Sequence, residues 1–206
     1  MSSHNTDQIL TGELLSLAQR IGRDAAAMLM DRPAELEVKT KSTAIDVVTQ
    51  MDIKVEAFIV EQILAARPND GLIGEEGADR ASTSGITWVI DPLDGTVNYL
   101  YDLPGWNVSI GVKDEEGPLV GVVTAPTINS TWWAVRGGGA FFNGNPIHCN
   151  DPIEFNRALV ATGFQYDVAH RIKQLEDLSS IVPLLRDMRR YGAAAVDLCN
   201  VAMGRV

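Results

Sequence analysis

The sequence contains little cysteine and no long apolar run. Its two cysteines, Cys149 and Cys199, are far apart and lack metal-site spacing, which argues against a disulfide framework and favours a reducing cytoplasm. No segment approaches the ~20 apolar residues of a membrane-spanning helix, and the N-terminus lacks the basic and apolar regions of a signal peptide. We therefore expect a soluble, cytoplasmic protein that does not bind a membrane.

Positive charge is also scarce. There are 17 lysines and arginines against 27 acidic residues, and the net charge is -10. Nucleic acids and anionic membranes are bound through basic patches, so neither is expected as a partner. An acidic protein that binds phosphate needs a local cation, which a divalent metal held by carboxylates would supply. The three histidines, His4, His148 and His170, match no catalytic pattern and are expected at the surface.

The apolar pattern predicts two subdomains. Helical spacing predicts a helix over residues 7–31 and a second one ending before Arg67, with a capping box of Thr49 and Asp52 at its start. Alternating residues predict an antiparallel meander over 108–112, 119–124, 131–135 and 140–142. Strands at 158–162 and 185–190 then alternate with helices at 168–182 and 193–203. We expect one unit over residues 1–148 and an incomplete α/β unit over 149–206.

The most informative stretch runs from Trp88 to Tyr99. Val89 and Ile90 indicate a buried strand that ends at Asp91 in a polar turn, Asp91-Pro92-Leu93-Asp94-Gly95-Thr96. Two acids three positions apart can converge on one cation, and a short helix from Thr96 would present free N-H groups to an anion. A metal and a phosphate are therefore the first hypothesis for this turn.

A further acid, Glu75, follows the short predicted strand Leu72-Ile73-Gly74. Hard carboxylate ligands suit Mg²⁺ or Mn²⁺, and few histidines or cysteines are available for zinc. Each acid alone is equally explained as a solvated turn residue or a helix cap. Together with Asp91 and Asp94, Glu75 indicates a metal site.

These blocks resemble the inositol monophosphatase family of metal-dependent sugar phosphatases. The resemblance rests on Gly74-Glu75-Glu76 and the stretch that begins at Trp88. It extends over nearly the whole chain through the segments 46–52, 136–144 and 189–198. It implies a layered αβαβα sandwich of the sugar-phosphatase type, a homodimer, and hydrolysis of a small phosphomonoester.

The resemblance also implies a role for each matching position. Glu75, Asp91 and the carbonyl of Leu93 would hold one Mg²⁺, and Asp91 and Asp94 would share a second. Gly95 and Thr96 would cradle the phosphate, and Thr96 would pair with Asp52 to activate the attacking water. Glu75, Leu93 and Asp94 would also contact the substrate. Asp52 is explained either by this role or by the capping box alone.

Other positions remain open between two interpretations. Lys41 and Asp46 match the neighbourhood of a third, weakly held metal, and Lys41 is equally explained as a solvated charge. The backbone of Gly192, Ala193 and Ala194 would meet substrate hydroxyls, or these are simply small residues at a helix start. Asp197 is expected to be structural, and the glycines at 137–139 to form a hairpin.

The predicted reaction is the Mg²⁺-dependent hydrolysis of inositol monophosphate by metal-activated water. Histidinol phosphate, fructose 1,6-bisphosphate and nucleotide 3'-phosphates are alternative substrates within the family. Family members continue past Val206 to a Trp-Asp motif that completes the second metal site. The chain as given is therefore expected to be weakly active and prone to associate, and a non-catalytic regulatory protein is the alternative of another class.

Overall fold

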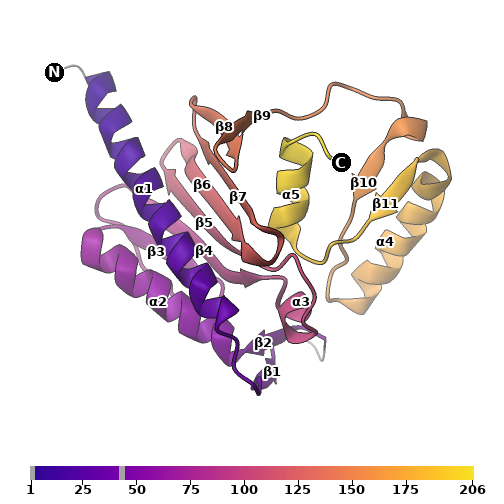
Figure 1. Cartoon of the computed structure of the whole chain (residues 1–206), viewed down its shortest axis with the longest axis horizontal. Helices are drawn as coiled ribbons and strands as arrows, with labels where there is room; N and C mark the ends of the chain where they lie inside the picture. Colours follow the sequence, from indigo (N-terminus) through magenta and orange to yellow (C-terminus); the bar gives the residue numbers. More distant parts are fainter. Residues whose placement is uncertain (1–2, 42–44) are drawn as a thin grey trace.

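The computed structural model describes residues 3–41 and 45–206 and centres on a seven-stranded sheet (Figure 1). Its strands are β3 (Gly71–Gly74), β4 (Thr87–Asp94), β5 (Asn107–Asp114), β6 (Gly117–Ala125), β7 (Ser130–Val135), β8 (Gly139–Phe142) and β9 (Asn145–Ile147). They lie side by side in chain order, and only β3 and β4 are parallel. The predicted meander is confirmed, with β9 as an additional strand that the apolar pattern did not indicate.

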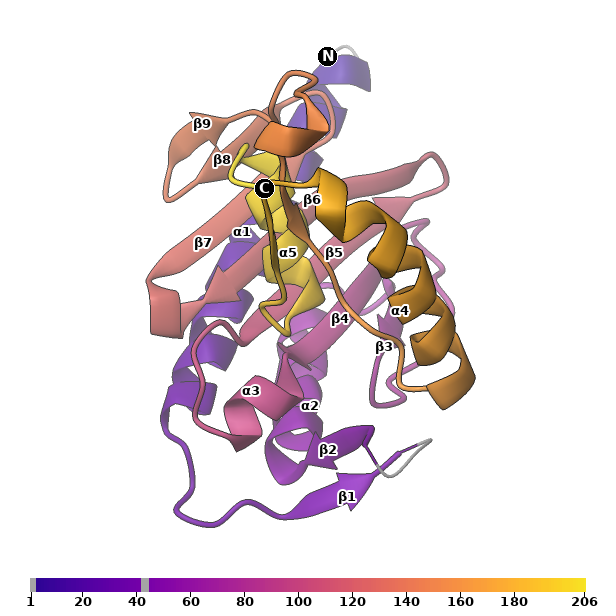
Figure 2. The same cartoon turned by 90° about the vertical axis from the view of Figure 1, so that its right-hand side faces the viewer.

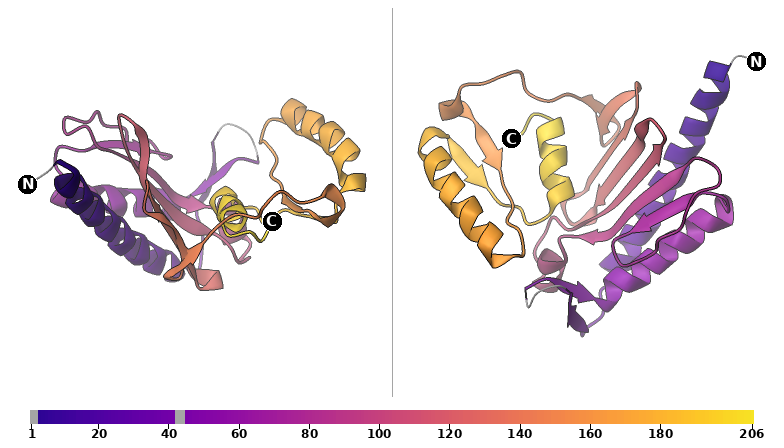
Figure 3. Two further views of the ribbon diagram at one scale, coloured as in Figure 1. Left: turned by 90° about the horizontal axis from the view of Figure 1, so that it is seen from above. Right: turned by 180° about the vertical axis from the view of Figure 1, so that it is seen from behind.

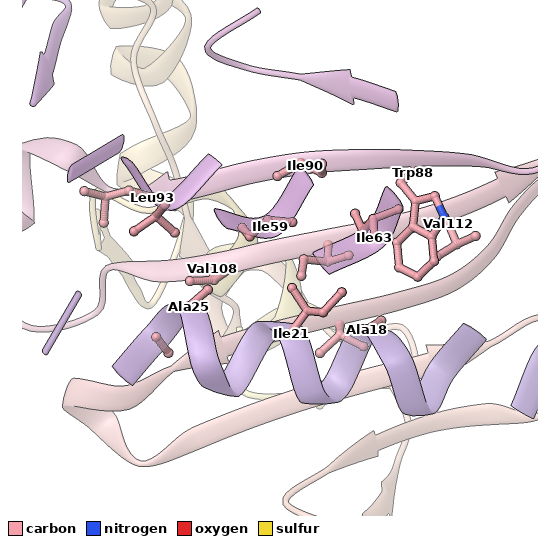
Figure 4. Packing of buried hydrophobic residues seen from close by; sticks show 14 of the residues in the cluster. Ala18, Ile21, Ala25, Ile59, Ile63, Trp88, Ile90, Leu93, Val108 and Val112 are labelled. Atoms are coloured by element: carbon pink, nitrogen blue, oxygen red, sulfur yellow. The ribbon is translucent and has the colours of Figure 1, made fainter. Parts of the chain in front are cut away.

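Two helices cover one face of this sheet. Helix α1 (Ser3–Met30) lies over β5 and β6, and α2 (Gln50–Ala66) lies over β4. Figure 4 shows side chains of both helices meeting residues of β4 and β5 in one apolar core. In β4, Trp88 and Ile90 enter this core while Val89 between them is exposed. The alternation of strand residues thus determines which face receives the helices.

The opposite face of the sheet is covered by elements from the C-terminal part of the chain. Helix α5 (Ala194–Ala202) packs on the sheet through Val196, next to Ala125 and Trp132. Beyond α5 lie two parallel strands, β10 (Leu159–Ala161) and β11 (Asp187–Arg189), and then α4 (Val168–Ile181). Figures 1 and 3 show these elements as successive layers, which gives the predicted αβαβα arrangement. Figure 2 looks along the stacking direction, with α4 and α5 in front of the central sheet.

Helix α5 leaves apolar side chains uncovered. In α5, Leu198 is 70% exposed and Val201 is 45% exposed. Strands β10 and β11 pair only with each other among the described residues, so each has an unpaired edge. Such edges and apolar surfaces favour association with other molecules.

The structure contains short elements that the sequence pattern did not indicate. The polar stretch before α2 contains a small antiparallel pair, β1 (Val38–Thr40) and β2 (Val47–Thr49), whose short strands offer too few alternating apolar residues to be recognised. Short 3-10 helices occupy Pro126–Ile128, Phe155–Arg157 and Val182–Leu184. His148 and His170 are exposed as expected, and the side chain of His4 lies outside the described part.

Candidate active site

Strand β4 does not stop at Asp91 as its sequence suggested. It continues to Asp94, because Asp91 pairs with Ser109 and Asp94 with Asn107, which leaves one extra residue on β4. Pro92 has no N-H to donate to the neighbouring strand, and the N-H of Leu93 donates to Oδ1 of Asp91 at 3.1 Å instead. The expected turn is therefore a β-bulge at the end of a strand.

This bulge has a direct consequence for the two acids. In a regular strand, residues three apart point to opposite faces, whereas one inserted residue returns them to the same face. Ile90 and Leu93 both enter the apolar core beneath α1 and α2. Asp91 and Asp94 consequently share the other face, where both line one cavity.

The turn after the bulge depends on Gly95. Its φ of 90° lies in the left-handed region, and it is the N-cap residue of the short helix α3 (Thr96–Leu100). A Cβ at this position would lie 3.1 Å from Cβ of Ala193 and 3.3 Å from Cα of Trp106. Glycine therefore allows the turn to approach the start of α5 closely.

Asp52 connects this turn to helix α2. Thr96 donates from Oγ1 to Oδ1 of Asp52 at 3.0 Å, and the same hydroxyl lies 3.1 Å from the carbonyl of Leu93. Oδ2 of Asp52 accepts from the N-H and hydroxyl of Thr49, which completes the predicted capping box. Burial raises the pKa of Asp52, and these hydrogen bonds offset only part of that effect. The two interpretations of Asp52 are thus compatible, since each uses a different oxygen.

Glu75 lies just after β3, and its side chain is paired with Lys41. Nζ of Lys41 is 2.8 Å from Oε1 of Glu75 and 2.6 Å from Oε1 of Glu76. Burial would lower the pKa of Lys41, but the two carboxylates outweigh that effect and raise it. Lys41 is therefore a charged member of the acidic cluster and not a freely solvated side chain.

Asp91 is the most strongly perturbed acid of the cluster. Burial, followed by repulsion from Glu75 and Asp94, raises the pKa of Asp91 to about 9. A hydrogen bond between Asp91 and Glu75 also favours the protonated carboxyl group. Carboxyl groups gathered in this way favour either a bound proton or a bound cation.

Asp94 contacts the start of α5. Its Oδ1 accepts from the N-H of Ala194 at 3.0 Å, and Oδ2 accepts from the N-H of Ala195 at 2.7 Å. Oδ2 also accepts from Nδ2 of Asn107 at 2.9 Å. The amide of Ala194, considered above for substrate hydroxyls, thus donates to Asp94 in this structure.

Gly192 and Ala193 are placed next to the turn by Asn98 of α3. The side chain of Asn98 donates to the carbonyl of Tyr191 at 2.8 Å and to that of Pro104 at 3.2 Å. Gly192 has a φ of 83°, and a Cβ there would lie 2.8 Å from Oδ1 of Asn98. Asn98 and Asn107 are positioning residues that sequence patterns did not indicate, because an isolated asparagine carries no periodic signal.

These elements enclose a cavity of about 560 Å³ between the sheet and the outer layer. It is lined by Glu75, Asp91, Leu93, Asp94, Gly95, Thr96, Ala161, Thr162, Gly163, Phe164, Tyr166, Arg190, Gly192, Ala193, Ala194, Asp197 and Leu198. Most of the residues expected at the site therefore share one cavity. Asp52 and Lys41 reach it through Thr96 and Glu75, and the backbone of Asp46 bonds that of Lys41.

Asp197 was expected to be structural, but it lines this cavity. Burial and the nearby Asp94 carboxylate raise the pKa of Asp197 to about 6, and its Oδ1 is buried without a hydrogen-bond partner among the described residues. Arg190 lies at the same cavity, with its guanidinium carbon 5.9 Å from the centre of the Phe164 ring. The cavity wall thus combines acidic, basic and aromatic groups beyond the acids of β4.

A family comparison identifies the chain. The model of the inositol monophosphatase family matches residues 10–206. The chain belongs to this family. Inositol monophosphatases are metal-dependent phosphomonoesterases, so the chain is assigned to the phosphoric monoester hydrolases.

Individual inositol monophosphatases and related proteins agree with this assignment. The inositol-1-monophosphatase SuhB of Mycobacterium tuberculosis is 37% identical over 213 residues, covering 94% of this chain and 73% of the relative. A Pasteurella multocida protein named Nus factor SuhB is 36% identical over 198 residues, covering 94% of this chain and 74% of that protein.

Solved structures of the family share the fold. The suhB protein of Bartonella henselae superposes with a TM-score of 0.88 at 30% identity, covering 94% of this chain and 76% of that chain. The inositol monophosphatase of Thermotoga maritima superposes with a TM-score of 0.85 at 29% identity, covering 94% and 74%. The αβαβα layering is therefore the inositol monophosphatase fold.

The family site is not arranged as a ready metal cage in this structure. Among residues 3–41 and 45–206, no group of three histidine, cysteine or acidic side chains has a geometry that could hold a metal ion. Lys41 binds Glu75, and the amides of α5 bind Asp94, so both carboxylates already have partners.

Among residues 3–41 and 45–206, no helix is long and apolar enough to cross a membrane.

Proposed function

We propose that this chain is a Mg²⁺-dependent phosphatase that hydrolyses inositol monophosphate or a similar small phosphomonoester. The observation that carries the proposal is the hydrogen bond from Thr96 to buried Asp52, beside a cavity that also receives Asp91 and Asp94. The hydroxyl of Thr96, the proton acceptor Asp52 and carboxylates that could bind a metal therefore lie close together. The arrangement suits hydrolysis of a phosphate ester by water.

The proposed cation ligands are Glu75, Asp91 and the carbonyl of Leu93 for one ion, with Asp91 and Asp94 for a second. Oxygen donors of this kind fit Mg²⁺, and Mn²⁺ is also compatible. The raised pKa of Asp91 supports the fit, because crowded carboxyl groups gain from a cation. A third, weaker site would lie near Lys41 and Asp46. Bound divalent ions supply positive charge that acidifies water and stabilises the leaving oxygen.

The chain's own residues would handle the proton and the phosphate. Thr96 can accept a hydrogen bond from water while donating its own proton to Asp52, whose raised pKa favours holding a proton. The backbone N-H groups of Gly95 and Thr96 would orient the phosphate. Burial of Asp52 at 2% exposure keeps bulk water from competing for that proton.

The substrate's alcohol would extend toward α5 and the outer layer. Asp197, Arg190 and Tyr166 line that part of the cavity and offer hydrogen-bond donors and acceptors suited to a polyol. The same groups leave histidinol phosphate, fructose 1,6-bisphosphate and nucleotide 3'-phosphates as alternative substrates. The small residues Gly192, Ala193 and Ala194 leave room for a sugar-sized ring.

A panel of these four kinds of phosphate ester, assayed with Mg²⁺ and again with excess EDTA, tests the proposal. We expect phosphate release that requires Mg²⁺ and is greatest with inositol monophosphate. Asp91→Asn should abolish release while the circular dichroism spectrum is retained. Unchanged turnover of Asp91→Asn in Mg²⁺ would remove the proposal.

A second candidate is a non-catalytic regulatory role. It is favoured by the relative named Nus factor SuhB and by the exposed apolar residues of α5. Calorimetric titration with Mg²⁺ separates the two, because a catalytic site requires the ion and a purely regulatory scaffold does not. A homodimer in the cytoplasm is proposed in either case, and analytical ultracentrifugation measures the oligomeric state.

A further inference from the structure

Glu56 is a buried acid of α2 whose contacts all lead to the loop that carries Glu75. Glu56 is 5% exposed. Oε2 accepts from the N-H of Glu76 at 2.9 Å, and Oε1 accepts from the N-H of Ala78 at 3.2 Å. Burying a carboxylate is costly unless its oxygens are paired, and here both are paired with backbone donors of one loop.

The loop is shaped to receive this carboxylate. A Cβ on Gly74 would lie 2.4 Å from Oε2 of Glu56, so a larger residue would displace the side chain. Gly77 has a φ of 108°, which turns the loop between the two N-H groups that Glu56 binds. Upstream, the N-H of Glu75 donates to the carbonyl of Ile90 at 3.2 Å. The backbone around Glu75 is therefore held by β4 on one side and by Glu56 on the other.

Glu56 and Asp52 lie four residues apart, on one face of α2. Asp52 binds the hydroxyl of Thr96, and Glu56 binds the loop of Glu75. One turn of α2 thus links the turn at Thr96 to the loop that carries Glu75. Val55 and Ile59, both fully buried, anchor this part of α2 in the core.

We propose that Glu56 is a positioning residue for divalent cation binding, which acts by fixing Glu75 relative to Asp91. The inference rests on the proposed function, because it assumes that Glu75 and Asp91 bind the cation. Partners that orient metal ligands commonly contribute ~10–100-fold to metal affinity. Glu56 does so through the backbone and does not contact the ion.

The test measures binding of Mn²⁺ alone by the electron paramagnetic resonance signal of the free ion. Glu56→Gln keeps the size of the side chain but replaces one acceptor oxygen by a donor, which faces an N-H group. We expect this variant to bind Mn²⁺ ~10–100-fold more weakly than the wild type. Glu61→Gln, at an exposed position of the same helix, removes the same charge and should leave the affinity unchanged.

A second control separates positioning from general stability. Ile63→Val makes a small cavity in the core of α2, at a residue that is fully buried. It should lower the melting temperature without weakening Mn²⁺ binding. Glu56→Gln should also speed hydrogen exchange at the amides of Glu76 and Ala78 specifically. If Glu56→Gln does not fold, Glu56→Asp retains the charge, shortens the reach and is expected to weaken Mn²⁺ binding likewise.

The possible results are distinct. Mn²⁺ affinity of Glu56→Gln within about twofold of the wild type would overturn the inference. So would an equal loss of affinity in Ile63→Val at a matched melting temperature. If Asp91→Asn abolishes Mn²⁺ binding while Glu56→Gln retains it, only the role of Glu56 fails. If the wild type binds no Mn²⁺, the inference and the proposed metal site fail together.

Discussion

Thr96 donates a hydrogen bond to Oδ1 of Asp52 at 3.0 Å across 44 positions of the sequence. The other oxygen of Asp52 accepts from Thr49 and caps α2. Stability and the proposed proton transfer therefore use different oxygens of one carboxylate. Mutations on either side of Asp52 can separate the two effects.

Replacing Thr96 by valine keeps the shape of the side chain and removes the hydroxyl. We expect kcat with Mg²⁺ to fall by ~10²–10⁴-fold, the usual contribution of a positioned proton carrier, with a smaller change in KM. Thr49→Ala should instead cost ~1 kcal/mol of unfolding free energy through the lost cap and retain most of kcat. Steady-state kinetics and urea denaturation measure both. Equal losses of kcat in the two variants would assign Thr96 a structural role only.

Gly95 and Gly105 form a matched pair for testing the close approach of the turn at Gly95 to Ala193 and Trp106. The φ angle is 90° at Gly95 and 96° at Gly105, so alanine is strained by ~1–2 kcal/mol at either position. Only at Gly95 would the new Cβ also press on Ala193 and Trp106, whereas at Gly105 the nearest atom lies 3.9 Å away. Gly95→Ala should therefore lose phosphatase activity and more stability than Gly105→Ala in urea denaturation. Equal behaviour would show that the contact with α5 does not matter.

The raised pKa of Asp91 predicts how the metal-free protein responds to pH. Its folded pKa of about 9 exceeds the ordinary value of 3.8, so the folded state binds the proton more tightly than the unfolded chain. The Asp91 contribution to stability is complete at low pH and is lost progressively as the pH rises toward 9.

Thermal unfolding in EDTA measures this effect between the two pKa values. We expect the melting temperature of the wild type to fall with rising pH more steeply than that of Asp91→Asn, which cannot ionise. Addition of Mg²⁺ at neutral pH should release protons into the buffer, because the cation replaces the proton among the acids. Parallel pH curves for the two proteins would contradict the assigned shift.

Asp70 is a structural acid outside the site. Burial would raise the pKa of Asp70, but hydrogen bonds from Arg67, Ser84 and Trp88 outweigh it and lower the pKa. The contribution of Asp70 to stability is present above the pKa of an ordinary aspartate. It is lost as the pH falls through the lowered pKa of Asp70 in the folded protein. Asp70→Ala should cost ~1–3 kcal/mol in urea denaturation, since the buried indole N-H of Trp88 loses its acceptor while the partly exposed Arg67 can be solvated.

The exposed Asp79 provides the control for Asp70. Asp79→Ala should leave the urea midpoint unchanged and keep the acid sensitivity of the wild type. A change of Asp70→Ala as small as that of Asp79→Ala would show that the buried network with Arg67 and Trp88 contributes little.

Local patterns predicted the elements whose side chains repeat regularly. The helical spacing of Leu14, Ile21 and Ala25 and the alternation of Val108 and Ile110 match their buried faces. The grouping of Asp91 and Asp94 was also expected. The bulge that places them on one face was not, because it depends on pairing with β5, a strand that follows later in the chain.

Other residues near the site could not be placed from the sequence, for one physical reason. Asp197 was assigned a structural role because a single acid on a helix carries no sign of what faces it. It lines the cavity only because α5 packs on the central sheet beside β4. The position of Asn98 at the site could not be predicted either, because its partner Tyr191 lies 93 positions away in the sequence. Contacts between residues so distant in sequence are determined by topology and leave no local pattern.

The bonds from Ala194 and Ala195 to Asp94 span 100 and 101 positions. Contacts between residues so distant in sequence close large loops, which carries an entropic cost. Helix α5 supplies both the amides that bind Asp94 and, through Ala194, Asp197 and Leu198, part of the cavity wall. Loss of the contact between α5 and the central sheet would therefore open the cavity and expose the Asp94 carboxylate together.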